Sequence, residues 1–198
     1  AMGTRIHVEL WHEQPEVAAA GIAAVMAEMT RIDQLMSPWI ASSELARINR
    51  EAANGWLPIS AEMSALLARS LEFSRVSDGA FDITFASAGF LYDYRAGQRP
   101  SPQQLQQATG RIDWRQLQLD GANSRLRFAK PGVVIDLGGI AKGHAVDNAI
   151  KRLKALGIAH ALLTAGGDTR LLGDRRGRPW LVAIKDPRAA DKEAVVLP

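Results

Sequence analysis

Apolar residues near the start of the chain follow two different spacings. Residues 4–11 alternate between apolar and polar side chains, which predicts a half-buried strand. From Pro15 to about Met36 the apolar residues recur every three or four positions, which predicts a helix with one buried face. This helix should end at Ser37, because Pro38 disfavours helical geometry in the residue before it. The residues of the expected buried face are Ile22, Val25, Met29, Ile32 and Met36.

Three later serines are placed to begin helices. Ser43 can cap a short helix, and Ser60 can cap a longer one. Ser101 can cap a third helix that runs to Gly110, and Gln104 completes the capping-box pattern three residues after that serine. The first half of the chain is therefore predicted to be mostly helical.

The second half of the chain is predicted to consist mainly of short strands. One helical pattern, residues 141–156, interrupts them. The last two strands are joined by a turn around Gly177. Helices followed by strands indicate an α+β fold and not a regular βαβ series. The predicted strands are residues 116–120, 125–130, 133–135, 159–165, 169–172 and 180–185.

The composition excludes several classes of function. The 198 residues are 47% hydrophobic and 23% charged, as expected of one globular domain with a single core. The net charge is +3, but basic and acidic residues alternate and no nucleic-acid-binding pattern is present, so nucleic acid is not an expected partner. Without cysteine, this chain has no disulfide, thiolate nucleophile or iron–sulfur cluster. No apolar run approaches the roughly twenty residues of a membrane-spanning helix.

The strongest chemical signal lies in residues 133–144. Asp136 ends a predicted strand, and the pair Gly138-Gly139 follows it. Glycines let a ligand approach the backbone closely, and free amides at a helix start favour an anion. Lys142, in the first helical turn, opposes the helix dipole unless a pyrophosphate or Asp136 lies nearby. The pattern indicates a phosphate-binding turn; a β-turn-α connection with a solvated lysine is the alternative, and the spacing is neither a Rossmann fingerprint nor a P-loop.

Weaker signals occur elsewhere, each with an ordinary structural explanation. Residues 77–84 place Phe81 after a helix end, where a helix cap and a core phenylalanine would look the same. Two glycines within residues 164–168 fit a tight turn or a bulge. Trp39, just beyond a helix end, could stack on a flat ring or be half-buried. The 4 histidines have no metal-ligand spacing, so none is given a role.

Together these segments resemble the ApbE family of flavin transferases, the FAD:protein FMN transferases. Residues 43–49 are similar to the family's S-E-L-x-x-[IL]-N, residues 79–84 to its G-A-F-D-x-T, and residues 165–168 to its G-G-D turn. The best match is D-L-G-G-I-A-K-G-x-A-V-D at residues 136–147. The resemblance runs from end to end. It implies that residues 1–198 are the N-terminal two-thirds of one domain, of class α+β, with a mixed or antiparallel sheet and flanking helices, and incomplete at the C-terminus.

The resemblance also implies a reaction and a site. The reaction is Mg²⁺-dependent transfer of FMN from FAD to a Thr or Ser hydroxyl of a partner flavoprotein, with release of AMP. The carbonyl of Gly139 would be one ligand of the Mg²⁺ ion, which prefers oxygen ligands and usually binds through few protein groups plus substrate phosphates. No catalytic base is assigned. The residues implied to contact FAD are Met2, Trp39, Ala80, Phe81, Asp82, Asp136 and Lys142.

Several family segments, T-S-G, H-[IV]-x-[DN]-P and D-A-x-x-T, are not found in this sequence. In the family they carry metal ligands and an acid–base group. We therefore expect the 198-residue chain alone not to flavinylate an acceptor at an enzymatic rate. Two alternatives stay open: an FAD-binding protein without transfer chemistry, and an FAD pyrophosphatase that gives FMN and AMP. The resemblance also implies a periplasmic location or a lipid anchor at the inner membrane, although this chain carries no such signal.

Overall fold

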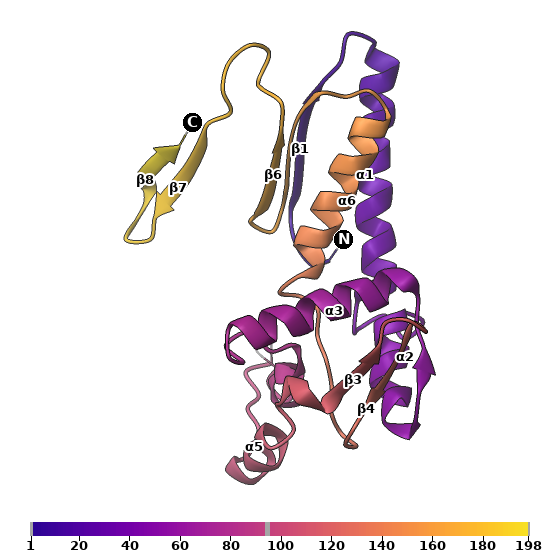
Figure 1. Ribbon diagram of the computed structural model, residues 1–198. Coiled ribbons are helices and arrows are strands. Elements are labelled where there is room, and N and C mark those ends of the chain that lie inside the picture. The colour runs from indigo at the N-terminus through magenta and orange to yellow at the C-terminus, as the bar shows by residue number, and fades with distance from the viewer. Residues whose placement is uncertain (1, 94–95, 198) are drawn as a thin grey trace. The chain divides into compact units, whose positions relative to one another are not determined.

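A computed structural model describes residues 2–93 and 96–197 of the chain, which forms two compact units (Figure 1). Unit 1 consists of Ala1–Thr30 and Ala145–Pro198, and unit 2 consists of Arg31–His144. Two helices, α1 (Pro15–Met36) and α6 (Ala141–Ala155), contribute residues to both units. The limits of both helices agree with the predicted ones to within one residue.

Unit 1 is built on a three-stranded antiparallel sheet. Its strands lie in the order β1 (Ile6–Trp11), β5 (His160–Ala165) and β6 (Asp168–Leu172). β1 and β5 pair along their whole lengths, from Ile6 opposite Ala165 to Trp11 opposite His160. Alternate side chains of β5 are fully buried, as expected of a sheet with one covered face. The unit 1 portions of α1 and α6 lie along this sheet (Figure 1).

The buried face of α1 differs from the predicted one at its N-terminal end. Ile22 is 45% exposed, so its assignment to the buried face was wrong. Gly21 occupies that position, because a Cβ atom there would lie 2.4 Å from Ile158 and 3.2 Å from Leu10. The helix packs too closely at this turn for a side chain. The other four predicted positions, Val25, Met29, Ile32 and Met36, are buried.

The last two strands of unit 1 form a separate hairpin. β7 (Val182–Asp186) pairs antiparallel with β8 (Ala189–Leu197). The predicted turn around Arg176-Gly177 is present, since Arg175 N–H donates to the Arg178 carbonyl at 2.7 Å and Gly177 has φ 83°. However, the strands on either side of that turn, β6 and β7, belong to different sheets.

Unit 2 combines helices with a second antiparallel sheet. The strand order is β2 (Leu57–Pro58), β4 (Arg125–Phe128) and β3 (Leu117–Asp120), and α3 (Ala61–Val76) contacts β3. The remaining elements are α2 (Glu44–Glu51), α4 (Ala86–Gly89), α5 (Pro102–Thr109) and the 3₁₀ turns η1 (Ala52–Asn54), η2 (Ile83–Phe85) and η3 (Trp114–Gln116).

The helix caps of unit 2 agree with the predictions. The side chains of Ser43, Ser60 and Ser101 each accept a backbone hydrogen bond from the first turn of α2, α3 and α5, respectively. Gln104 donates its backbone N–H to the Ser101 side chain and accepts from the Ser101 backbone through its own side chain, which completes the capping box. These local signals determine where the three helices begin.

Val133 and Ile135 are buried, as expected, and Val134 is half-buried, but residues 133–135 do not form a strand. Side chains take the place of a neighbouring strand. Asn49 accepts from Ile135 N–H and donates to the Ile135 carbonyl, both at 2.9 Å. The Ser87 hydroxyl accepts from Val134 N–H at 3.0 Å and donates to its carbonyl at 3.2 Å. The backbone is thus satisfied without strand pairing.

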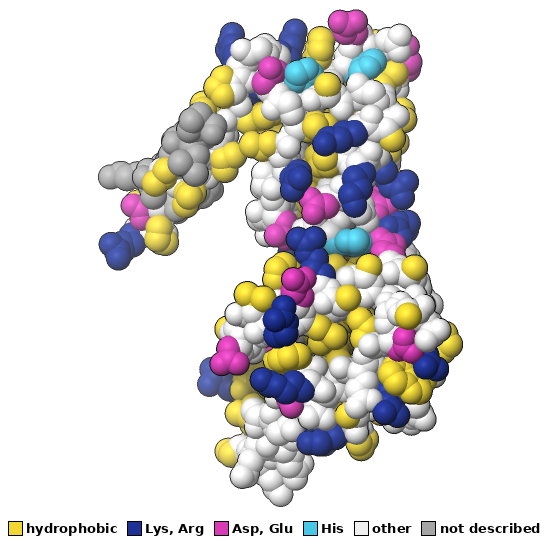
Figure 2. Space-filling model, viewed as in Figure 1, with side chains coloured by type: hydrophobic (Ala, Val, Ile, Leu, Met, Phe, Trp, Pro, Cys, Tyr) yellow, Lys and Arg dark blue, Asp and Glu magenta, His cyan; other side chains and the backbone are white. Residues whose placement is uncertain are grey.

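Helices packed with antiparallel sheets confirm the α+β class. Within the described ranges, no helix has both the length and the apolar character needed to cross a membrane. Basic and acidic side chains are interspersed over the surface seen in Figure 2.

Candidate functional site

The predicted phosphate-binding turn is an ordered loop in unit 2, which we call the glycine turn (residues 136–142). Asp136 Oδ1 accepts from Gly138 N–H at 2.8 Å, and Ile140 N–H and Ala141 N–H both donate to the Leu137 carbonyl. The ammonium group of Lys142 donates to the Gly138 carbonyl. The lysine therefore folds back over the turn, where its charge lies beside the backbone that begins α6.

The two glycines of this turn provide space. Neither has a positive φ. A Cβ atom at Gly138 would lie 2.7 Å from Asp136 Oδ1, and one at Gly139 would lie 3.4 Å from the ring of Phe81. Both glycines are exposed. The backbone of the turn is therefore accessible to a ligand, beside a lysine and a helix N-terminus that both favour an anion.

The segment Ser43–Asn49 stabilises two parts of the site without a predicted ligand contact. At one end, the Ser43 hydroxyl donates to the Ser37 carbonyl at 2.6 Å, two residues before Trp39. At the other end, Asn49 holds Ile135 just before the glycine turn. The sequence did not indicate either role.

Trp39 is an exposed aromatic surface. Its side chain is 77% exposed, so the half-buried alternative is wrong. Its only described ring partner is Phe90, with centroids 5.0 Å apart and planes inclined by 39°. Much of the indole is therefore available to stack on a flat ring.

Residues 80–82 follow the end of α3 and reach the glycine turn. The half-buried ring of Phe81 packs edge-on against Phe73 at 5.9 Å and lies against Gly139. The Asp82 carboxylate accepts three hydrogen bonds, from the backbone and hydroxyl of Thr84 at 2.8 and 2.7 Å and from Trp114 N–H at 2.9 Å. Asp82 thus stabilises this loop through its side chain, and its contact with FAD stays a prediction.

The structure brings most of the predicted site residues into one region of unit 2. Besides the Phe81–Gly139 contact, Asp136 N–H donates to the Ile83 carbonyl at 3.0 Å. Ala80 is exposed beside Phe81. Met2 belongs to unit 1, where it is half-buried with φ 54°, and its contact with FAD stays a prediction.

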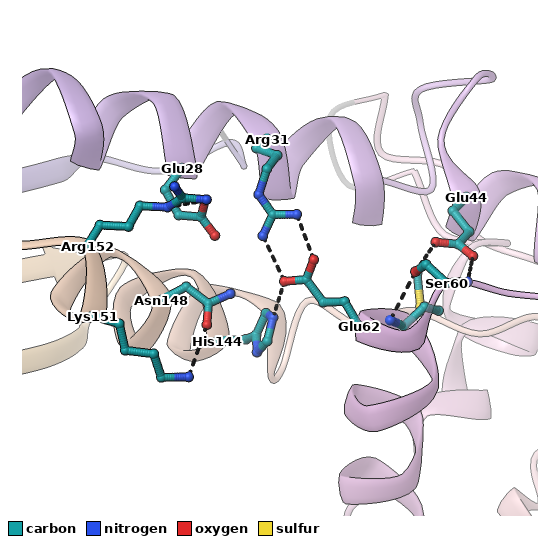
Figure 3. A network of polar contacts seen from close by, with 10 residues as sticks. Glu28, Arg31, Glu44, Ser60, Glu62, His144, Asn148, Lys151 and Arg152 are labelled. Atoms are coloured by element: carbon teal, nitrogen blue, oxygen red, sulfur yellow. Dashed lines mark hydrogen bonds and ion pairs between the residues drawn. The ribbon is translucent and has the colours of Figure 1, made fainter. Parts of the chain in front are cut away.

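A polar cluster in unit 2, which no sequence motif indicated, lies at the first turn of α6 (Figure 3). The Arg31 guanidinium makes two hydrogen bonds to the Glu62 carboxylate, at 2.6 and 2.7 Å. His144 Nε2 lies 2.7 Å from Glu62 Oε1. The hydrogen bonds from Arg31, aided by His144, lower the pKa of Glu62 from 4.5 to about 2, against the opposing effect of burial. We call these three residues the Glu62 cluster.

Comparison with known proteins assigns the chain to a family. The model of the ApbE family matches residues 2–198. The chain belongs to the ApbE family. Among similar proteins, the FAD:protein FMN transferase of Haemophilus influenzae is 31% identical over 98% of this chain, and that of Treponema pallidum is 28% identical over 99%.

Solved structures of ApbE proteins share the fold. The ApbE protein of Thermotoga maritima matches 99% of this chain with a TM-score of 0.86 and 31% identity, and the flavin transferase ApbE of Vibrio cholerae matches 94% with a TM-score of 0.85 and 25% identity. This chain spans 59% of the Haemophilus influenzae relative and 64% of the Thermotoga maritima structure, or about three-fifths of their lengths.

In this ApbE-family chain, the glycine turn offers a metal ion backbone oxygen and no cluster of side chains. No group of three or more His, Asp or Glu side chains in residues 2–93 and 96–197 could hold a metal ion. Gly139 contributes a backbone carbonyl on an exposed residue, a hard oxygen of the kind that Mg²⁺ accepts. The described residues thus fit Mg²⁺ as a partial ligand set, to be completed by other oxygens such as those of a diphosphate.

Proposed function

We propose that the chain binds FAD at the glycine turn and is part of an enzyme that transfers FMN from FAD to a Thr or Ser hydroxyl of a partner flavoprotein. The observation that carries this proposal is the placement of an exposed glycine backbone, the Lys142 ammonium and the start of α6 in one turn. Membership of the ApbE family supports the reaction, because similar proteins are named FAD:protein FMN transferases.

The chemistry of FAD matches this arrangement. A diphosphate carries negative charge that Lys142 and the positive end of the α6 dipole can bind. An isoalloxazine or adenine ring is flat, and Trp39 presents an exposed flat surface in the same unit. Phe81 lies beside Gly139 and Asp82 holds the backbone next to it, so both residues would position the loop that borders the site.

The proposed transfer breaks the phosphoanhydride bond of FAD and forms a phosphoester bond to the acceptor. The acceptor hydroxyl oxygen attacks the flavin-side phosphorus, the bond from this phosphorus to the bridging oxygen breaks, and AMP leaves with that oxygen. The hydroxyl proton passes to a base that these residues do not identify. A Mg²⁺ ion held by the Gly139 carbonyl and the diphosphate would stabilise the developing charge. Lys142 would stabilise charge on the same phosphates.

The binding step is tested by fluorescence titration of the chain with FAD. We expect Lys142→Ala to weaken FAD binding by about tenfold or more, because a charge-assisted hydrogen bond to phosphate is lost. Lys151→Ala, on the same helix, is the matched control and should bind like the parent. Equal affinity of the parent and Lys142→Ala would remove Lys142 from the site, and a parent that does not bind FAD would overturn the proposal.

The transfer step is tested with a chimera that joins this chain to the C-terminal part of the Haemophilus influenzae relative. The chimera is incubated with FAD, Mg²⁺ and an acceptor that carries a target threonine. Added FMN on the acceptor, seen as a mass shift, is the expected result. AMP and free FMN without acceptor labelling would favour a pyrophosphatase, and bound FAD without AMP release would favour a binding protein.

A further inference from the structure

The Glu62 cluster joins three helices of unit 2 at one carboxylate. Arg31 lies on the last part of α1, Glu62 on the first turn of α3, and His144 on the first turn of α6 (Figure 3). The side chains of Glu62 and His144 are only 26% and 22% exposed. With a pKa of about 2, Glu62 is ionised at neutral pH and can only accept, so His144 donates from Nε2.

Contacts hold the glycine turn on both sides, where its two glycines by themselves restrict the backbone little. On the upstream side, Asn49 and Ser87 hold residues 134–135 through four hydrogen bonds. On the downstream side, the His144 N–H donates to the Ile140 carbonyl at 3.0 Å, and its ring reaches Glu62. His144 therefore connects the end of the turn to α3.

We propose that His144 is a positioning residue for the glycine turn: by donating to Glu62, which Arg31 orients, it fixes the first turn of α6 and with it Lys142 and the backbone of the turn. The bidentate contact from Arg31 makes Glu62 a fixed acceptor. A ring bonded to a fixed carboxylate restricts the turn more than a mobile side chain would. The expected effect of His144 on ligand binding rests on the proposed binding of FAD at the glycine turn.

The positioning role is first tested without any ligand, by amide hydrogen exchange. In His144→Leu, the backbone amides of Ala141 and of the residue at position 144 should exchange roughly tenfold faster, because local opening of the first turn of α6 becomes easier. The amide of Leu163 in β5 should not change. His144→Gln keeps an N–H donor and should restore most of the protection. Unchanged exchange at Ala141 in His144→Leu would overturn the proposal; if this variant does not fold, His144→Phe replaces it.

The second test measures FAD affinity in a double-mutant cycle. We expect His144→Leu to weaken binding roughly three- to tenfold, and to have little further effect in the Glu62→Met background, because contacting residues are coupled. His160→Leu, which removes a histidine that pairs with Asp174 in unit 1, is the matched control and should keep parental affinity. Additive effects of the two substitutions would show that His144 does not act through Glu62.

The two tests separate the inference from the proposed function. If the parent binds no FAD, the proposed function fails, while the exchange measurement still decides whether His144 positions the turn. If the parent binds FAD and His144→Leu binds it equally well, the inference is wrong and the FAD site is untouched.

Discussion

Two glycine pairs in this chain look alike in sequence and differ in the physical reason for their glycines. Gly166 and Gly167 connect β5 to β6, with Ala165 opposite Asp168, and both have positive φ, 61° and 106°. A Cβ atom at Gly167 would meet nothing within 4 Å. At the glycine turn, Gly138 has an ordinary φ, but a Cβ atom would collide with Asp136.

The first pair is therefore required by backbone conformation, whereas in the second pair Gly138 is favoured by the space that Asp136 leaves. The hairpin is closed by its own strand pairing and by one backbone hydrogen bond, from Gly166 N–H to the Arg5 carbonyl at 3.2 Å, whereas the glycine turn depends on side chains from distant parts of unit 2. A turn that is held from outside and leaves its backbone exposed is suited to a ligand. A turn that closes its own ladder is suited to connecting strands.

The largest effect should come from removing an outside support of the glycine turn. Asn49→Ala leaves both backbone groups of the fully buried Ile135 without partners, so we expect a loss of roughly 2–4 kcal/mol in the free energy of unfolding. At the hairpin, Thr164→Val removes the 3.0 Å contact between Thr164 and Thr169, which is exposed, and should cost less than about 1 kcal/mol. Urea denaturation measures both. Equal losses would mean that the two turns are held in the same way.

Acid should weaken the Glu62 cluster, which supports the glycine turn on its downstream side. The pKa of Glu62 is lowered from 4.5 to about 2, mainly by Arg31, so its stabilisation is fully present above pH 4.5 and is lost as the pH falls through about 2. The shift sets an upper limit of roughly 3 kcal/mol, and partial exposure of both side chains reduces it. Unfolding free energies at several pH values should fall more steeply for the parent than for Glu62→Gln. Parallel curves would contradict this assignment.

Alanine substitutions distinguish a glycine that is required by its backbone conformation from a glycine that is required because a side chain has no room. Gly138→Ala displaces the Asp136 carboxylate from Gly138 N–H, so FAD binding should weaken by about tenfold. Gly167→Ala should instead lower the free energy of unfolding by about 1–2 kcal/mol, because alanine is strained at positive φ, and leave FAD affinity unchanged. Titration and thermal unfolding are measured on both variants. A Gly167→Ala variant that binds FAD weakly would break the distinction.

Gly139→Ala should have the smallest effect. Its Cβ atom would touch the Phe81 ring at 3.4 Å, which is close to ordinary van der Waals contact. We expect FAD affinity within about threefold of the parent and a change in unfolding free energy below about 1 kcal/mol. A loss as large as that of Gly138→Ala would show that the space beside Phe81 is occupied by the ligand.

Local signals in the sequence predicted the helices because their causes are local. The side chains of Ser43, Ser60 and Ser101 each accept a hydrogen bond from the backbone N–H three residues further on. The predicted strand at residues 133–135 was wrong because its hydrogen-bond partners, Asn49 and Ser87, lie 86 and 47 residues away. Burial was predictable from apolar side chains, but the identity of the backbone partners was not.

Distance along the chain also explains why the sequence did not predict the Glu62 cluster. The family motifs place the glycine turn and Phe81, which the structure brings into contact. The Glu62–His144 pair joins residues 82 positions apart. In the sequence, Glu62 resembles an acid in a first helical turn, and His144 one of several scattered histidines. Nothing in the spacing relates the two.

NMR amide shifts during a titration with FAD show directly whether FAD binds at the glycine turn. The amides of Gly138, Gly139 and Ile140 should shift as FAD is added to the parent. Those of Gly166 and Gly167 should stay unchanged, because their turn closes a hairpin. Saturable shifts at Gly166 and Gly167 with none at Gly138 and Gly139 would mean that FAD does not bind at the glycine turn.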